Sequence, residues 1–215
     1  MSKKKATGGK SPPKLSPSQL ESADAMPAEE LAARRAELEA QALQRQQQQG
    51  VDLLRQGATL LARSRAGEAA AKLEQAAALL PDDPDVAINL GGAYVMQGRY
   101  NKAVSVLERA SGLAPDNAMV WTNLAAAYLG SLELSGPQQQ HNAIAAYQRA
   151  LQIDPSAPNV HYNLGLIYSD RHDWNQARIC FTQALAVNPN DGDARRWLGR
   201  IAQLEQGNTA DQVSD

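Results

Sequence analysis

Three histidines and one cysteine are the residues best suited to metal binding or nucleophilic catalysis in this sequence. They are His141, His161, His172 and Cys180, and they are widely separated along the chain. No two of them have the Cys-x-x-Cys or His-x-x-x-His spacing of a metal site, and no phosphate loop or nucleophile elbow occurs. We therefore expect a protein that is not an enzyme, with no catalytic residue, no metal site and no cofactor. Cys180, beside Phe181, is expected to be a buried thiol, His161 to pack in a helix and His172 to lie in a turn.

Asparagines form a second set of polar residues, and they recur along the chain as Asn89, Asn123 and Asn163. Asn in a helix interior is about 0.5 kcal/mol less favourable than Ala, but its amide offers one acceptor and two donors. A row of such amides suits the alternating C=O and N–H groups of an extended peptide backbone. Whether the three amides can act together depends on the elements that carry them.

Those elements are sequence repeats. Gly91 and Ala125 are separated by one period of about 34 residues, and so are Pro155 and Pro189. A period of this length with two amphipathic halves is typical of a stacked helix-turn-helix array. The predicted units are the repeats 50–83, 84–117, 118–157 and 158–191 and a capping helix at 192–206. Asn89 and Asn123 lie one period apart, and Asn163 occupies the same slot of the fourth repeat.

Two repeats depart from the pattern. The third is six residues longer than the period, and the extra residues lie within Gly130 to His141. Gly136-Pro137 followed by three glutamines predicts a polar loop and a helix that restarts near Pro137. The insertion is either a functional loop or a tolerated one. The first repeat has Gln56 where the others have Leu, as expected for a terminal repeat that faces solvent on one side.

The segments that flank the repeats are polar. Residues 1–26 contain five lysines and no aromatic residue, which predicts a disordered basic tail. This tail is either a tether for an acidic partner or nucleic acid, or a solubilising segment. Residues 27–49 are predicted to form a leader helix with a thin apolar stripe, which is a weak coiled-coil seam, a partner helix or a solvated helix, and Gly50 either breaks or weakens it. Residues 207–215 are predicted to be a disordered tail.

Composition restricts the function classes further. The 215 residues carry a formal net charge of −2, so the chain as a whole is not expected to bind nucleic acid. No apolar run approaches the roughly 18 residues of a membrane span, and the lysine-rich start has no apolar region of a secretory signal. One cysteine excludes an internal disulfide framework and suits a reducing compartment, so we expect a cytoplasmic protein. The sequence leaves the oligomeric state and the identity of the partner open.

Residues 50–206 resemble the tetratricopeptide repeat (TPR) family. The resemblance rests on positions that recur in each repeat, in the second Leu90, Gly91, Tyr94, Gly98, Tyr100, Ala103, Leu107, Ala110 and Pro115. It implies an all-α fold, a right-handed α-α superhelix (TPR solenoid) with a capping helix, whose first helices line a concave groove that commonly binds peptides or protein segments. The asparagine row is similar to the asparagine ladder of O-linked N-acetylglucosamine transferases, although no catalytic domain follows it.

The resemblance also indicates which residues face the groove. Each helical residue turns by about 100°, so Asn123 lies about 200° from Trp121 and opposite the core stripe. The expected peptide-binding residues are Asn89, Asn123, Asn163, Met96, Met119, Tyr162 and Leu166, with Ile88, Gly92 and Ala126 beside them. Alternatively, the asparagines bond across repeats. Heat-shock co-chaperones of the family clamp a terminal carboxylate with Lys and Arg, and no such clamp is expected here, since those slots hold Asp85, Asn89, Met119, Asn123, Asn159 and Asn163.

The cap helix adds Arg196 and Arg200 near the end of the groove, which either meet an acidic group or form a solvated face. Trp197 between them either closes the core or ends the groove. The predicted function is a non-enzymatic protein–protein interaction module, an adaptor or scaffold, that binds an extended peptide or protein segment in its concave groove. The alternative is a structural scaffold that self-associates or is autoinhibited through its N-terminal helix.

Overall fold

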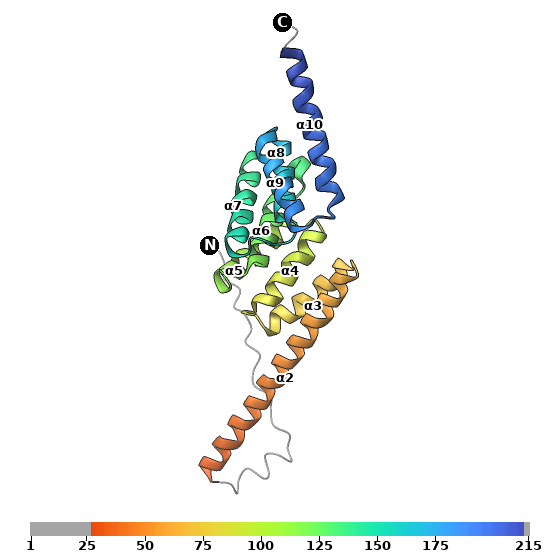
Figure 1. The fold of residues 1–215 in the computed structure, drawn as a ribbon. Helices are drawn as coiled ribbons and strands as arrows, with labels where there is room; N and C mark the ends of the chain where they lie inside the picture. The colour runs from red at the N-terminus through yellow and green to blue at the C-terminus, as the bar shows by residue number, and fades with distance from the viewer. Residues whose placement is uncertain (1–26, 213–215) are drawn as a thin grey trace, which may run out of the picture. The chain divides into compact units, whose positions relative to one another are not determined.

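The computed structural model describes residues 27–212, with side chains to residue 205. Every regular element within residues 27–212 is helical, and Figure 1 shows the helices in chain order. They are α2 (Ala28–Ala62), α3 (Ala66–Leu79), α4 (Pro84–Met96), α5 (Tyr100–Leu113), α6 (Ala118–Leu129), the 3-10 helix η1 (Leu132–Leu134), α7 (Pro137–Ile153), α8 (Val160–Asp170), α9 (Trp174–Val187) and α10 (Gly192–Gln212). The tail predicted at residues 1–26 lies outside the described residues.

The chain divides into two compact units between Gln46 and Gln47. In the first unit, the described residues from Ala28 onward belong to helix α2, and Leu38 and Leu43 on it are exposed. The helix runs through Gly50 without a break, so this glycine does not end the leader helix. Within the second unit Gly50 is buried, and a Cβ atom there would lie 2.5 Å from Leu80 Cγ. The glycine therefore provides room for close packing.

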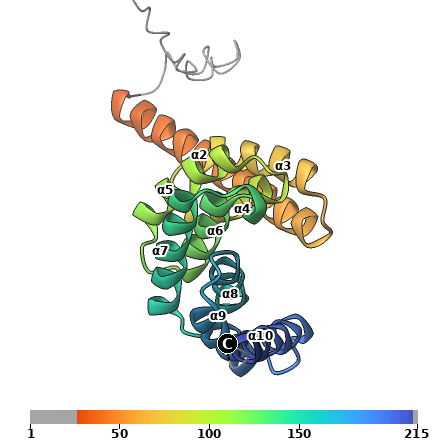
Figure 2. The same ribbon diagram turned by 90° about the horizontal axis from the view of Figure 1, so that it is seen from above.

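The second unit is built from helix pairs that stack in two layers. Helix α4 packs on α5, α6 on α7, and α8 on α9, while α5 also packs on α6, α7 on α8 and α9 on α10. The first helices α4 and α6 contact each other directly. Figure 2 shows α5 and α7 on one side of α4 and α6. This arrangement agrees with the helix-turn-helix units predicted from the sequence period.

Short polar residues and glycines set the ends of these helices. Asp83 caps α4 by accepting hydrogen bonds from the backbone N–H groups of Asp85 at 2.9 Å and Val86 at 3.1 Å. Pro84 follows at the first helical position, where its missing N–H group costs nothing. Gly98 has φ of 70° in the turn after α4, a left-handed conformation that glycine adopts without strain. Sequence and local structure therefore agree at both ends of the second repeat's first helix.

Small residues allow the two helices of a repeat to approach closely. A Cβ atom at Gly91 would lie 2.4 Å from Leu107 Cγ, so no larger side chain fits between α4 and α5. Ala103 on α5 is fully buried, which confirms that both positions are small because of helix packing. Gln56 is exposed, whereas Leu90 in the corresponding slot is buried. The first repeat thus has a polar residue where its packing face meets solvent.

A hydrogen bond to the preceding turn recurs in successive repeats. Trp121 Nε1 donates to the Pro115 carbonyl oxygen at 2.8 Å, and His161 Nε2 lies 3.1 Å from that of Pro155. Arg195 on the cap helix donates to the Pro189 carbonyl oxygen at 2.7 Å. These three side chains occupy the same slot of the repeat. The prediction that His161 packs in place of Trp121 is confirmed, and the imidazole also takes over the hydrogen bond.

The insertion in the third repeat forms the connection 130–136 and lengthens α7. Helix α7 begins at Pro137, as predicted, but Gln140 is a buried part of this helix and not of a polar loop. Its Nε2 donates to Asp170 Oδ2 at 2.7 Å, and its Oε1 accepts from Arg171 Nε at 2.8 Å. Both partners lie in the fourth repeat. The amide is buried because partners there satisfy both of its ends.

The cap helix is longer than predicted. Helix α10 continues to Gln212, whereas the sequence predicted an end at residue 206 and a disordered tail from 207. A single glycine such as Gly207 costs about 1 kcal/mol in a helix, which is too little to end one by itself. Residues 213–215 lie outside the described part of the chain. Trp197 on this helix stacks on Phe181 with ring centroids 5.6 Å apart, so it closes the core.

Candidate functional site

The three asparagines of the candidate groove occupy equivalent positions on α4, α6 and α8. Asn89, Asn123 and Asn163 are all half-buried. Asn89 Nδ2 donates to the carbonyl oxygen of Asp85 in its own helix at 2.8 Å. Asn123 Nδ2 donates across the repeat boundary to the Ile88 carbonyl oxygen at 3.4 Å. The Asn163 side chain forms a hydrogen bond with the buried hydroxyl group of Tyr147.

These contacts bear on how the amides could bind a ligand. Each amide has two N–H donors and one carbonyl oxygen that can accept two hydrogen bonds, so one internal bond leaves capacity for others. Asn123 also lies beside the backbone of Gly92, where an added Cβ atom would be 3.7 Å from its Nδ2. Bonding across repeats, the alternative role of these residues, applies to Asn123 and Asn163. It does not conflict with ligand binding, and the site remains a prediction.

The apolar residues of the candidate site fall into two pairs. Met96 and Met119 are 52% and 60% exposed, which leaves their flexible side chains available for contacts. Tyr162 and Leu166 are half-buried and pack against the cluster that contains Phe181 and Trp197. The Tyr162 ring meets the Phe181 ring edge to face at 5.7 Å. A ligand can therefore touch only the exposed parts of this second pair.

Ile88 does not lie on an open surface, contrary to expectation. It is 4% exposed and packs with Ala110 and Val120 in a buried cluster. The helical angle placed it next to Asn89, but the following repeat covers this side of α4. Ile88 is thus not available for contact with a ligand at the second repeat.

The hydrogen bond between Tyr147 and Asn163 joins the candidate site to the buried core. Burial raises the pKa of Tyr147 to about 12, and the hydrogen bond from Asn163 opposes part of this rise. The hydroxyl group therefore keeps its proton in the folded state at pH values where a tyrosine in the unfolded chain, with its pKa near 10, loses it. Folding thus favours the protonated form of Tyr147.

Tyr147 should make the protein less stable above pH 10. Because the folded-state pKa is raised, its contribution is complete below pH 10 and is lost as the pH rises through 12. The loss for one tyrosine is on the order of 2 kcal/mol, and Tyr147→Phe should remove this part of the pH dependence. Urea unfolding of both proteins between pH 8 and pH 12 measures the difference. An equal decrease in both proteins would contradict the assignment.

The other reactive or charged side chains singled out in the sequence are engaged in packing or ion pairs. Cys180 is buried as expected, and burial raises the pKa of its thiol to about 11. His172 lies in the turn before α9 with φ of 57° and its ring is 5.4 Å from that of Trp174. Arg196 is paired with Asp193 on its own helix, and Arg200 lies over the Trp197 ring at 5.0 Å. Among residues 27–205, no group of three His, Cys, Asp or Glu side chains is placed to hold a metal ion.

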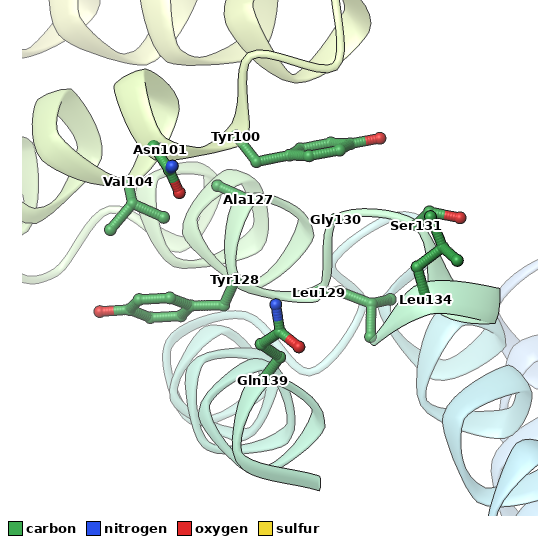
Figure 3. A pocket seen from close by; sticks show the side chains of 10 residues that line it. All are labelled: Tyr100, Asn101, Val104, Ala127, Tyr128, Leu129, Gly130, Ser131, Leu134 and Gln139. Atoms are coloured by element: carbon green, nitrogen blue, oxygen red, sulfur yellow. The ribbon is translucent and has the colours of Figure 1, made fainter. Parts of the chain in front are cut away.

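The insertion creates a pocket that the sequence did not predict. We call it the insertion pocket, and Figure 3 shows its lining residues from α5, α6, α7 and the connection after α6. Its volume is about 420 Å³, and its uncharged lining consists of Tyr100, Asn101, Val104, Ala127, Tyr128, Leu129, Gly130, Ser131, Leu134 and Gln139. Leu134 at its edge is 84% exposed. The pocket exists because the longer connection turns back beside Tyr100.

None of the helices within the described residues is both long and apolar enough to cross a membrane.

Stacked helix pairs of this kind define an α-solenoid, and comparison with known proteins identifies its family. Sequence models of the tetratricopeptide repeat match residues 60–130 and 158–191, and a TPR repeat model matches residues 138–171. These matches together span more than half of the chain. The chain belongs to the tetratricopeptide repeat family and has its all-α, right-handed solenoid fold.

Solved structures give the same result. One structure of the protein MamA, from MSR-1, is 27% identical, with a TM-score of 0.58 over 73% of this chain and 87% of that chain. The TPR protein TTC0263 of Thermus thermophilus is 21% identical, with a TM-score of 0.62 over 73% of this chain and 82% of its own. MamA 41-end from Desulfovibrio magneticus RS-1 is 21% identical, with a TM-score of 0.61 over 76% of this chain and 90% of its own. A search of the curated proteins found no match. Family and fold together make this chain a protein–protein interaction module.

Proposed function

We propose that the second to fourth repeats bind an extended segment of a partner protein along the face formed by α4, α6 and α8. Asn89, Asn123 and Asn163 hydrogen-bond the backbone of this segment. Four residues supply apolar contacts: Met96, Met119, Tyr162 and Leu166. The module itself is non-catalytic, as TPR domains generally are.

The recurrence of one half-buried amide per repeat is the observation that supports this proposal. The three amides lie on consecutive first helices in equivalent slots, and each retains donors or acceptors beyond its single internal hydrogen bond. Two of the neighbouring side chains, Met96 and Met119, are more than half exposed. Backbone-directed amides between adaptable apolar side chains suit a ligand that is held mainly by its main chain.

Replacing Asn89, Asn123 and Asn163 together with alanine tests the proposal. Random dodecapeptides displayed on phage are first selected on the full-length protein, and the enriched peptides are synthesised. Loss of three hydrogen bonds of about 1 kcal/mol each should weaken their binding about 100-fold, measured by isothermal titration calorimetry. The free energy of unfolding should change by only about 1 kcal/mol, because the better helix propensity of alanine offsets part of the lost internal bonds.

The second helices offer a matched control. Asn101, Asn142 and Asn175 lie on α5, α7 and α9, one per repeat, so their triple alanine variant removes three amides from the other layer. This control should bind the peptides as the wild type does. Equal affinity of the wild type and the first triple variant would refute the proposed mode of binding.

One observation favours the alternative, a scaffold that self-associates through its N-terminal helix. Leu38 and Leu43 on the first compact unit are 43% and 56% exposed, so this helix presents two large apolar side chains to solvent. Light scattering of the full chain, over the concentrations used for peptide binding, separates the two functions. A monomer of constant mass that binds the selected peptides supports the peptide-binding function. A stable dimer that binds none of them supports the self-associating scaffold.

A further inference from the structure

A second pocket lies between the fourth repeat and the cap helix, and we call it the cap pocket. Its volume is about 300 Å³. Its lining comes from η1, α8, the turn before α9, α9 and α10 and consists of Leu132, Leu166, Ser169, Asp170, His172, Trp174, Trp197, Arg200 and Leu204. Leu166 also belongs to the proposed peptide-binding face. The cap pocket is therefore continuous with that face at its C-terminal end.

Rigid aromatic side chains form the walls of the cap pocket. Trp197 stacks on the fully buried Phe181 at 5.6 Å and an interplanar angle of 7°. Trp174 contacts the His172 ring at 5.4 Å and packs against the same core cluster. Ligand pockets in proteins commonly measure about 300–1,000 Å³, so a space of this size suits one large side chain and its immediate neighbour. Aromatic walls that are held by the core favour an apolar side chain.

Ser169 supplies an unpaired polar group to this pocket. The residue is 5% exposed, and its hydroxyl group has no hydrogen-bond partner within the described residues. Other helical hydroxyls of the chain behave differently, since Thr59, Thr122 and Thr182 each donate to the carbonyl oxygen four residues earlier at 2.8–2.9 Å. A buried polar group without a partner is unfavourable, and a ligand that provides the partner removes this cost. Ser169 is thus suited to a main-chain group of the bound segment.

Arg200 supplies a positive charge that is not paired with a carboxylate of residues 27–205. Every arginine of residues 47–205 except Arg63 and Arg200 lies within ion-pair or hydrogen-bond distance of a carboxylate, amide or carbonyl oxygen. The Arg200 guanidinium lies over the Trp197 ring at 5.0 Å, at the pocket. The carboxylate that lines the pocket, Asp170, already accepts from Gln140 at 2.7 Å. Asp170 and Arg200 form no ion pair with each other, so the Arg200 guanidinium is able to pair with a carboxylate of a ligand.

We propose that the cap pocket anchors an apolar side chain that has an aspartate or glutamate beside it in the partner segment. The apolar side chain lies between Leu132, Trp174 and Trp197. A main-chain group bonds Ser169, and the acidic side chain pairs with Arg200. This inference rests on the proposed function, because it names the sequence feature that the bound segment carries at its end over the cap helix.

The experiment uses the same library of phage-displayed dodecapeptides and the full-length protein. Peptides selected on the wild type should contain an apolar residue next to Asp or Glu. Selection on Arg200→Glu should replace the acidic residue with Lys or Arg, and wild-type peptides should bind this variant about 10-fold more weakly. Arg63→Glu is the matched control, since Arg63 is the other unpaired arginine of residues 47–205 and lies outside the cap pocket. This control should leave the selected motif and the affinity unchanged.

A second variant and a spectroscopic readout do not depend on the charge reversal. Ser169→Ala should raise thermal stability, because it removes an unpaired buried hydroxyl, and should weaken peptide binding about 5-fold. A purely structural serine would not give these opposite effects. In NMR titrations with a selected peptide, the indole N–H signals of Trp174 and Trp197 should shift. The signal of Trp121, which is bonded to the Pro115 carbonyl oxygen away from this pocket, should not.

The outcomes separate this inference from the proposed function. If the triple asparagine variant loses binding while Arg200→Glu behaves as Arg63→Glu does, the cap pocket assignment is overturned. Binding of the segment along α4, α6 and α8 is then still supported. If neither set of variants affects binding, or the library yields no enriched peptide, both proposals are wrong. A charge switch in the selected motif together with shifts of the two tryptophans supports the cap pocket.

Discussion

Replacing Phe181 with alanine should lower the free energy of unfolding by about 3–5 kcal/mol, the largest effect we expect from a single substitution. Phe181 is fully buried and stacks on Trp197 of the cap helix at 5.6 Å. Its edge also meets Tyr162 on α8 at 5.7 Å. One ring thus joins three helices, and its removal leaves a cavity that none of them can close alone. Urea unfolding followed by circular dichroism and tryptophan fluorescence measures the loss.

An exposed residue on the same helix provides the control for this substitution. Ile179 lies two positions before Phe181 and is 48% exposed. Ile179→Ala should cost less than about 1 kcal/mol, because little apolar surface returns to water. A similar loss in both variants would mean that Phe181 does not hold the cap helix to the fourth repeat.

Replacing either of two glycines in equivalent slots with alanine should change the free energy of unfolding, in opposite directions. A Cβ atom at Gly165 would lie 2.6 Å from Phe181 Cε1, whereas nothing lies within 4 Å of a Cβ atom at Gly199. Gly165→Ala should therefore destabilise the protein by about 1–3 kcal/mol despite the better helix propensity of alanine. Gly199→Ala has no clash and should gain up to about 1 kcal/mol. Thermal unfolding of the two variants measures both changes.

A double variant tests whether the Phe181 ring causes the clash at Gly165. Adding Phe181→Leu to Gly165→Ala should cost less than the sum of the two single changes, because the ring atoms that meet the new methyl group are gone. Additive losses would show that Gly165 is needed for a reason other than the space taken by Phe181.

The sequence predicted the repeat architecture well because the relevant signals are local. Gly91, Ala103 and Leu107 recur at fixed positions, and their burial follows from helix geometry and side-chain size alone. The start of α7 at Pro137 was predictable for the same reason, since proline favours the first turn of a helix. Such features need no knowledge of distant contacts.

Features that depend on neighbouring repeats could not be predicted. Gln140 follows two other glutamines and resembles a solvated residue, yet partners in the next repeat bury it. Ile88 was expected to face the groove because the helical angle does not show that the next repeat covers it. Gly50 is compatible with both a helix end and a close contact, and only the position of Leu80 decides between them.

The candidate site was predictable only in part for the same reason. The helical period locates Asn89, Asn123 and Asn163 in one slot, but their hydrogen-bond partners differ. Asn89 bonds within its own helix, whereas the partners of Asn123 and Asn163 lie on α4 and α7. Arg200 was visible in the sequence as one of a basic pair. The ion pair of Arg196 with Asp193, the unpaired hydroxyl of Ser169 and the wall supplied by Leu132 required the folded chain.

The buried amide of Gln140 has a mechanical consequence for the solenoid. It fastens α7 of the third repeat to the end of α8 through Asp170 and Arg171, with bonds of 2.7 and 2.8 Å. Sliding one helix along the other would leave this amide unpaired away from water, which costs about 1–3 kcal/mol. We therefore expect the third and fourth repeats to keep their register when the superhelix bends.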